Sequence, residues 1–215
     1  MSKNWEELWR EDEKTIRWLM PDYHVLYHVE QYGDISNYKA LDIGAGVGRH
    51  TNYLLQKGCI VDAIEPTDSS IAMLTALKTD NLSIIKNDLA VLKDYSDNLF
   101  EIVIAWNVIY HLNFNEIVTA VRDIFRVMKP GGIFLLTLNS VRNIHYGSGM
   151  EIEKNTFIKQ SKLDGEHVHH YSDRQEIDVL LKDFKILSIA ENEEIVGYKF
   201  FKERWHWYIV AQKNK

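Results

Sequence analysis

The chain has 215 residues and is acidic, with 25 Lys and Arg against 31 Asp and Glu and a formal net charge of −6. A chain of this length can bury a substantial core in one domain, and its negative charge argues against general nucleic-acid binding, which depends on neutralising phosphates. No apolar run is long enough for a membrane-spanning helix, and a single cysteine, Cys59, excludes an intramolecular disulfide. We therefore expect one cytoplasmic domain over 1–215, without an apolar signal segment or a membrane partner.

The segment 1–36 precedes the first expected strand and carries many aromatic residues. From 4 to 19 they partly follow helical spacing, and Pro21-Asp22 then interrupts the pattern and begins a second short helix that contains Tyr23 and Tyr27. These tyrosines either pack against the edge of a sheet or close over a ligand, and both interpretations stay open. If the tyrosines close over a ligand, the segment 1–36 is a helical lid.

A glycine-rich turn follows the first expected strand, in the run Ala40-Leu41-Asp42-Ile43-Gly44-Ala45-Gly46-Val47-Gly48-Arg49. Glycines at alternate positions allow a sharp turn from strand to helix and admit a ligand against the main chain. The dinucleotide motif needs a glycine where Arg49 stands, and Asp42 at the strand tip would repel a pyrophosphate. An acid there instead suits a cationic ligand with an amino group and a nucleoside, a description that S-adenosylmethionine meets.

Acidic residues also end the next two expected strands. The strand 59–64 ends at Glu65-Pro66, where a carboxylate can accept hydrogen bonds from both ribose hydroxyls. Asp68 and Ser69 then cap a helix, and the third strand, 83–86, ends at Asn87-Asp88-Leu89. Each of these acids is expected at the same edge of the sheet as the glycine turn.

The second half of the chain continues the alternation of strands and helices. A fourth strand, 100–106, leads into Asn107-Val108-Ile109-Tyr110-His111-Leu112, and an amphipathic helix, 115–127, leads through Lys129-Pro130-Gly131-Gly132 to a fifth strand, 133–138. The segment 139–172 is long, polar and poorly periodic, which is typical of a functional segment. A helix capped by Ser172 or Asp173 precedes two further strands, 185–189 and 205–211, that no helical pattern joins.

Taken in order, these motifs resemble those of class I S-adenosylmethionine-dependent methyltransferases, strongly over 38–140 and by element order elsewhere. The resemblance implies an α/β, Rossmann-like, doubly wound sheet of seven strands, the first five parallel, with a final antiparallel strand hairpin. It divides the chain into the lid 1–36, a cofactor-binding core 38–140, an acceptor-side insert 139–172 and a C-terminal helix and hairpin 173–215. The cofactor-binding residues that it implies are Asp42, Gly44, Ala45, Gly46, Glu65, Pro66, Asp88, Leu89 and Asn107.

The resemblance also implies the reaction, transfer of a methyl group by in-line displacement to a small, polar acceptor. It identifies catalytic residues poorly, because the cofactor arrives activated and the protein mainly aligns the reactants and excludes water. Tyr110-His111-Leu112 resembles the small-molecule branch and lacks the two prolines of the amide and base methyltransferases. His111 is either a general base or a helix-start histidine bonded to the backbone, and both interpretations stay open. The expected acceptor-binding residues are Tyr23, Tyr27, Tyr110, Asn143, Tyr146, His167 and His169.

Three other hypotheses follow from the same residues. In an extended segment His167 and His169 share a face, which Glu153 or Glu166 could join to bind a metal, but histidines in a polar loop more often face solvent or an acceptor, so we expect no metal. A non-catalytic S-adenosylmethionine-binding domain would keep the cofactor residues and lose the acceptor pocket. A nicotinamide-dependent oxidoreductase would also use the glycine turn and Glu65, although Arg49 and Asp42 disfavour it. The oligomeric state is not indicated.

Overall fold

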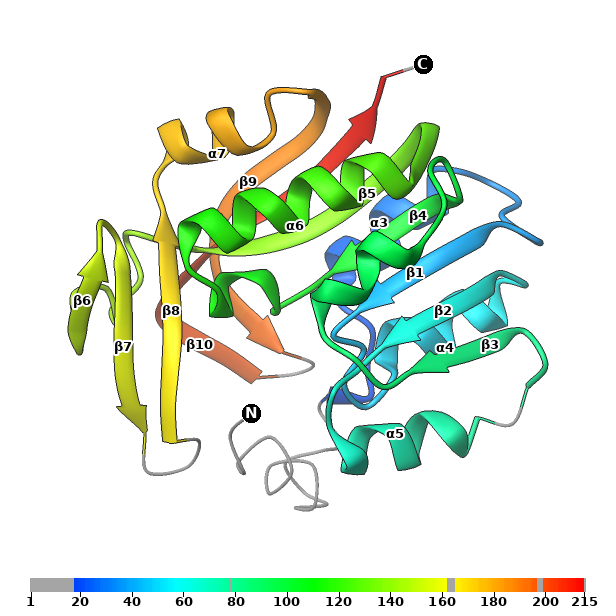
Figure 1. Ribbon diagram of the computed structural model, residues 1–215, viewed down its shortest axis with the longest axis horizontal. Helices are drawn as coiled ribbons and strands as arrows, with labels where there is room; N and C mark the ends of the chain where they lie inside the picture. Colours follow the sequence, from blue (N-terminus) through cyan, green and yellow to red (C-terminus); the bar gives the residue numbers. More distant parts are fainter. Residues whose placement is uncertain (1–17, 78, 162–164, 197–198, 215) are drawn as a thin grey trace.

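The computed structural model describes residues 18–77, 79–161, 165–196 and 199–214, so the expected helical pattern before residue 18 lies outside the described residues. Ten strands form one mixed sheet with helices on both faces (Figure 1). None of the helices in the described part combines the length and the apolar character that a membrane crossing demands.

The centre of the sheet is parallel, as the motifs predicted. Its strands are β1 (Lys39–Ile43), β2 (Ile60–Ile64), β3 (Leu82–Ile85), β4 (Phe100–Ala105) and β5 (Met128–Ser140). They lie in the order β3-β2-β1-β4-β5, and each neighbouring pair runs parallel. The chain order reverses between β1 and β4, and in open α/β sheets such a reversal opens a crevice at the carboxyl ends of the strands.

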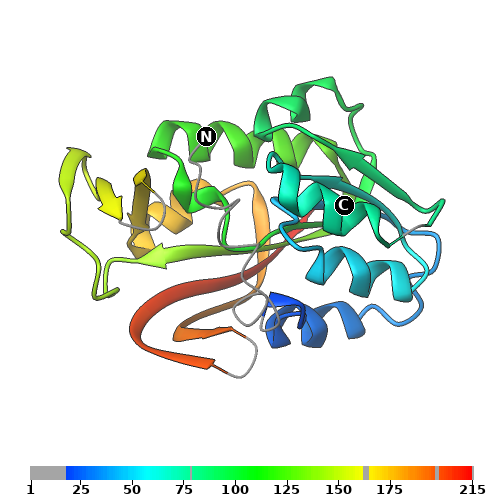
Figure 2. The ribbon, with the colours of Figure 1, turned by 90° about the horizontal axis from the view of Figure 1, so that it is seen from below.

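Helices cover both faces of this parallel centre. On one face, α3 (Tyr23–Glu30) and α4 (Arg49–Gln56) bury Val25, Val29 and Leu54 against β1 and β4. On the other, α6 (Phe114–Val127) and α7 (Arg174–Leu180) bury Ile117 and Ile177. Figure 2 shows α3 and α4 on the opposite side of the sheet from α6. The near-continuous burial of β1 and β4 follows from this double cover.

The remaining helices are short and lie near the strand tips. The helix α5 (Asp68–Thr75) begins after Thr67 as N-cap, one residue earlier than the expected cap. Two 3-10 helices, η2 (Leu89–Asp94) and η3 (Ile109–His111), follow β3 and β4. Asp173 caps α7 in a reciprocal capping box with Glu176, so of the two expected caps it is the aspartate that is used.

The expected antiparallel hairpin at the end of the chain is confirmed, with longer strands than the pattern indicated. The strands β9 (Phe184–Val196) and β10 (Lys199–Lys213) pair with each other, and β10 also pairs antiparallel with β5. Most of the expected connection 190–204 is therefore strand. The acidic side chains of this segment gave no strand pattern in the sequence. The strands pair all the same, because their hydrogen bonds join backbone groups whatever the polarity of the side chains.

The segment 139–172 is not a loop but adds three strands to the expected seven. They are β6 (Met150–Glu153), β7 (Thr156–Ser161) and β8 (Gly165–Ser172), and they form an antiparallel sheet whose last strand pairs parallel with the end of β5. We refer to β6–β8 as the insert sheet; it extends the main sheet beyond β5 (Figure 1). Its inward side chains are largely His, Thr and Tyr, so no apolar alternation marked it in the sequence.

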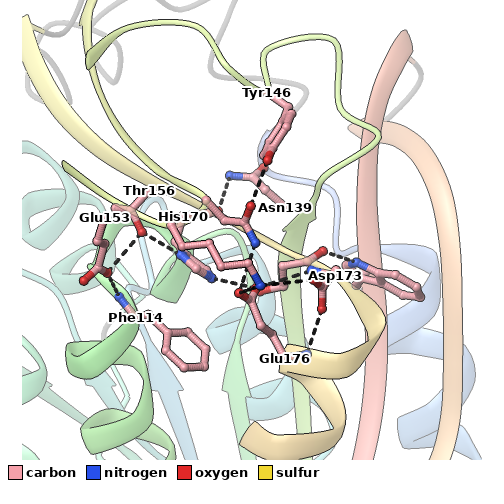
Figure 3. A network of polar contacts seen from close by, with 12 residues as sticks. Phe114, Asn139, Tyr146, Glu153, Thr156, His170, Asp173 and Glu176 are labelled. Atoms are coloured by element: carbon pink, nitrogen blue, oxygen red, sulfur yellow. Dashed lines mark hydrogen bonds and ion pairs between the residues drawn. The ribbon is translucent and has the colours of Figure 1, made fainter. Parts of the chain in front are cut away.

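Buried polar contacts attach the insert sheet to the rest of the fold (Figure 3). Glu153 Oε1 accepts hydrogen bonds from the Phe114 N–H at 2.6 Å and from Thr156 Oγ1 at 3.1 Å. Thr156 Oγ1 also lies 2.7 Å from His170 Nδ1, and His170 Nε2 lies 3.3 Å from Glu176 Oε2 on α7. One network thus joins β6, β7 and β8 to the first turns of α6 and α7.

Candidate functional site

A cavity of about 490 Å³ opens at the carboxyl ends of β1, β2, β3 and β4. This volume lies within the range of small-molecule sites. The residues that line it come from the glycine turn, the three following strand tips, the segment before α3 and the insert sheet: Trp18, Ile43, Gly44, Ala45, Gly46, Val47, Arg49, His50, Ile64, Glu65, Pro66, Thr67, Asn87, Asp88, Leu89, Trp106, Asn107, Val108, Tyr110, His111, Leu112, His167 and Val168.

The glycine turn forms the floor of the cavity. Gly44, Gly46 and Gly48 have φ values of +65°, +54° and +83°, which side chains disfavour. A Cβ on Gly44 would also lie 2.3 Å from Val108 Cγ2, so only a glycine lets the loop after β4 pack on this turn. The Gly44 and Ala45 N–H groups both donate to the Ile64 carbonyl, at 2.8 and 3.1 Å, which ties the turn to β2.

Glu65 joins the glycine turn to the tip of β2. Its Oε2 accepts from the Gly46 N–H at 2.9 Å, and its Oε1 accepts from the Thr67 N–H at 2.9 Å and from Thr67 Oγ1 at 2.6 Å. A carboxylate can accept about four hydrogen bonds, so this buried group on the cavity wall keeps capacity for a ligand hydroxyl.

Asp42 lies outside the cavity lining, in contrast to the expected direct contact with a ligand. Its side chain is buried beneath the turn, and its Oδ2 accepts from Thr51 Oγ1 of α4 at 2.6 Å. Strand residues alternate between faces, and position 42 faces α4. Burial raises the pKa of Asp42 to about 6, while the Thr51 hydrogen bond and the nearby Arg49 charge lower it.

The third wall of the cavity follows β3. Asn87, Asp88 and Leu89 line it, beside Pro66 and Thr67 at the end of β2. Asp88 is the N-cap of η2, where its Oδ1 accepts from the Ala90 N–H at 2.8 Å, and its own N–H donates to Asn87 Oδ1 at 2.9 Å. The expected cofactor residues Glu65, Pro66, Asp88 and Leu89 are thus brought together with the turn.

Asn107 turns the chain after β4 so that the next residues face the cavity. Its φ of +61° is held by Thr137 of β5: the Asn107 N–H donates to Thr137 Oγ1 at 2.8 Å, and that hydroxyl donates to Asn107 Oδ1 at 3.0 Å. The chain then forms η3, which carries Tyr110 and His111 into the lining.

Histidines of the insert sheet face η3. The His111 ring lies 4.7 Å from the His169 ring and 6.4 Å from the His167 ring, measured between centroids. His167 lines the cavity, whereas His169 lies behind it; burial and neighbouring positive charges lower the pKa of His169 to about 2. His170 points to the other face of β8, toward Thr156 and Glu176. Among the described residues, no group of three His, Cys, Asp or Glu side chains could hold a metal ion.

Besides His169, four expected acceptor residues lie outside the cavity lining. Tyr23 and Tyr27 stack on the outer face of α3 and are 71% and 50% exposed, because Val25 and Val29 take the inward positions. Asn143 Nδ2 donates to the Trp205 carbonyl at 3.1 Å, and the Tyr146 hydroxyl donates to Asn155 Oδ1 at 2.8 Å. These two hold the insert together.

Other lining residues escaped the sequence prediction. His50 Nε2 accepts from the Asp22 N–H at 3.2 Å and thereby ties α3 to α4; burial lowers the pKa of His50 well below its ordinary value. Trp106 lies at the tip of β4, 6.0 Å from the His50 ring. Arg49 directly follows the glycine turn, and only this position in the sequence could have indicated that it lines the cavity. No sequence pattern identified Trp18 or Val168 as lining residues.

Comparisons with known proteins agree with this geometry. A family model described as a methyltransferase domain matches residues 41–136. The ubiquinone biosynthesis O-methyltransferase of Rickettsia typhi is 26% identical over 216 residues, which cover 90% of this chain and 82% of that protein. The motifs, the strand order and this match agree. The chain is thus similar to class I S-adenosylmethionine-dependent methyltransferases, and residues 41–136 match the family model of their domain.

Two further similarities extend the comparison. The protein of the same name from Rickettsia canadensis is 27% identical over 128 residues, 58% of this chain, and the chain thus spans about half, 52%, of that relative. A solved S-adenosylmethionine-dependent methyltransferase from Methanosarcina mazei has a TM-score of 0.69 at 21% identity, covering 86% of this chain and 97% of its own. The latter likeness shows the fold.

Proposed function

We propose that this chain is an enzyme that transfers the methyl group of S-adenosylmethionine to a hydroxyl of a small, polar acceptor. When bound, the cofactor supplies a methyl group already activated on a sulfonium. The observation that carries the proposal is a cavity whose described lining includes the glycine turn, Glu65 and Asp88 together with His111 and His167. Such a cavity can align two molecules and exclude water between them.

The residues at the turn suit the cofactor. Glu65 and Asp88 are the two carboxylates on the wall, and each can accept from a neutral donor of a nucleoside, a hydroxyl or an amine. Leu89 and Pro66 supply apolar surface beside them for a flat ring. The glycine turn presents main chain without side chains, so a ligand can approach its N–H and C=O groups closely.

The residues around η3 suit an acceptor that loses a proton. The imidazole of His111 lines the cavity and can act as a general base toward an acceptor hydroxyl. The His169 ring packs beside it and is kept neutral by burial, so it adds no positive charge against protonation of His111. Both curated relatives are named O-methyltransferases, which supports oxygen as the atom that receives the methyl group.

Two other functions are less well supported. A domain that only bound the cofactor would not need the wall of Tyr110, His111 and His167 beyond the cofactor residues. A nicotinamide-dependent enzyme would receive a pyrophosphate at the N-terminus of α4, which here begins with the bulky, buried Arg49 instead of a glycine.

The proposal is tested by following a labelled methyl group from S-adenosylmethionine into a metabolite extract. The wild-type protein should transfer label to a small molecule, and His111→Ala should reduce the rate about a hundredfold with an unchanged affinity for S-adenosylhomocysteine. His145→Ala, which changes an exposed histidine outside the lining, is the matched control and should retain the rate. Absence of any labelled product would contradict the enzymatic function, and normal turnover of His111→Ala would remove that residue from the reaction.

A further inference from the structure

A lysine of the insert sheet lies directly beside the cavity lining. Lys159 of β7 is the register partner of His167 of β8, and the His167 side chain lines the cavity. Directly opposite residues of an antiparallel pair carry their side chains on the same face of the sheet, about 5 Å apart. Since β8 pairs with β5 on one side and with β7 on the other, Lys159 lies one strand beyond His167.

The half-buried ammonium group of Lys159 is not balanced by an acid. Its Nζ contacts the Tyr171 hydroxyl and lies 4.8 Å from the centre of the Tyr171 ring. Burial raises the pKa of Tyr171, so this phenol stays neutral and cannot offset the charge. Burial and the Arg204 charge lower the pKa of Lys159 to about 8, and no carboxylate in the described part of the chain raises it. The amine therefore keeps its charge at neutral pH at an energetic cost.

Arg204 of β10 brings a second positive charge to the same region. Its side chain is 43% exposed, and its Nη1 lies 3.8 Å from Glu194 Oε2. The turn that carries His145 is hydrogen-bonded to β10 on both sides of Arg204. The charges of Lys159 and Arg204 both lower the pKa of His145, so both reach this one imidazole. Glu194 offsets the charge of Arg204 in part and leaves that of Lys159 uncompensated.

Two partly buried cations that share one distant carboxylate favour an anionic ligand. Each opposes the charge of the other, and an anion with oxygen acceptors relieves both while it receives charge-assisted hydrogen bonds from the ammonium and the guanidinium. The expected cofactor residues follow β1, β2 and β3, whereas Lys159 lies across β4, β5 and β8 from them in the sheet order. Such an anion therefore belongs to the second molecule in the cavity.

We propose that Lys159 and Arg204 bind an anionic group, a carboxylate or a phosphate, of the methyl acceptor. The inference rests on the proposed function and specifies the class of its acceptor. The acceptor would carry a hydroxyl at His111 and an anionic group beyond His167, as seen from His111. Carboxylates and phosphates offer these donors the same kind of charged oxygen, and separate probes distinguish them.

The first experiment measures anion binding without turnover, with inorganic phosphate and acetate as probes at constant ionic strength. The reporter is the imidazole signal of His145 in nuclear magnetic resonance, assigned as the signal that His145→Ala loses. A bound anion offsets the two charges that lower the pKa of His145, so saturating probe should raise that pKa in the wild type. The probe that binds more tightly identifies the class of anion.

Three variants accompany the wild type in this titration. Lys159→Gln should bind the probes about tenfold more weakly, because a charge-assisted hydrogen bond is lost. Lys159→Arg keeps the charge and should bind them nearly as well as the wild type does. Lys185→Gln is the matched control, since it removes an exposed lysine at the opposite end of β9 from Glu194, and it should bind the probes unchanged.

The second experiment addresses the acceptor itself. Labelled methyl groups are followed from S-adenosylmethionine into a metabolite extract, which is then separated on an anion-exchange resin. The wild type should label molecules that the resin retains. Lys159→Gln should label them about tenfold more slowly with an unchanged affinity for S-adenosylhomocysteine, and Lys159→Arg should restore most of the rate.

The inference is overturned if the wild type binds neither probe, if Lys159→Gln binds them as the wild type does, or if the wild type labels only molecules that the resin does not retain. It is also overturned if Lys159→Gln and Lys159→Arg are impaired equally, because the loss would then come from a distorted insert sheet. Binding of the probes that depends on Lys159, without transfer of any label by the wild type, would instead count against the proposed function. The two failures are therefore distinguishable.

Discussion

At the scale of single residues, two carboxylates that follow similar strands have different surroundings. Glu65 accepts three hydrogen bonds on the cavity wall, whereas Asp42, beneath the turn, accepts a hydrogen bond from one hydroxyl. Hydrogen bonds to an ionised carboxylate favour its charge, whereas burial without enough of them disfavours it. The sequence showed both as acids at strand tips and could not show this difference, because it depends on which face each side chain takes.

Asp42 should make the stability of the free protein depend on pH. Burial raises its pKa from the ordinary 3.8 to about 6, so the folded state binds the proton more tightly, and stability falls as pH rises from about 4 to 6. By linkage the loss is on the order of 3 kcal/mol. Asp42→Asn keeps an acceptor for Thr51 without the charge, so in urea unfolding it should be more stable than the wild type at pH 7.5. At pH 4.5 this gain in stability should be smaller. An equal difference at both pH values would contradict this.

At the scale of elements, apolar runs predicted the parallel strands, and polar inward residues concealed the insert sheet. The strands β1, β2 and β4 are largely buried on both faces, so their sequences are mostly apolar, interrupted by Asp42, Asp62 and Glu101. In β7 and β8 the buried positions include Thr156, His170 and Tyr171, whose polar atoms contact partners across the two strands, 14 residues apart for Thr156 and His170 and 12 for Lys159 and Tyr171. A pattern read along one chain segment cannot reveal such partners.

Thr156 is the test of how the insert sheet is attached. Thr156→Val keeps the shape but removes the hydroxyl between Glu153 Oε1 and His170 Nδ1, which leaves two polar atoms without this partner. We expect a loss of about 1–3 kcal/mol in the free energy of unfolding, measured by urea denaturation. Thr119→Val, which removes an exposed hydroxyl bonded within α6, should cost less than about 0.5 kcal/mol. Equal losses in the two variants would show that the network contributes no specific stability.

At the scale of the whole molecule, the cavity is assembled from segments that lie far apart in the sequence. Motifs at the strand tips identified Glu65, Pro66, Asp88 and Leu89 of the lining, since the sheet itself places each strand tip, whereas Asp42 lies outside the lining. The lining that we propose for the acceptor draws on the three segments expected for it, the N-terminal segment, the end of β4 and the insert. Of the residues expected there, Tyr110 and His167 line the cavity, whereas Tyr23, Tyr27, Asn143, Tyr146 and His169 do not. Which residue of a segment faces the cavity depends on how the segment packs against other elements, and the sequence motifs do not indicate this packing.

The most direct test of the account is a calorimetric titration of the wild type and Glu65→Gln with S-adenosylhomocysteine, with NAD as the competing ligand. We expect the wild type to bind S-adenosylhomocysteine and not NAD, and Glu65→Gln to bind S-adenosylhomocysteine about tenfold to a hundredfold more weakly, because the charged acceptor for a ligand hydroxyl is lost. Asp178→Asn, which removes an exposed carboxylate on α7 outside the cavity lining, should bind as the wild type does. Equal affinity of the wild type and Glu65→Gln, or binding of NAD in place of S-adenosylhomocysteine, would contradict the assignment of this cavity.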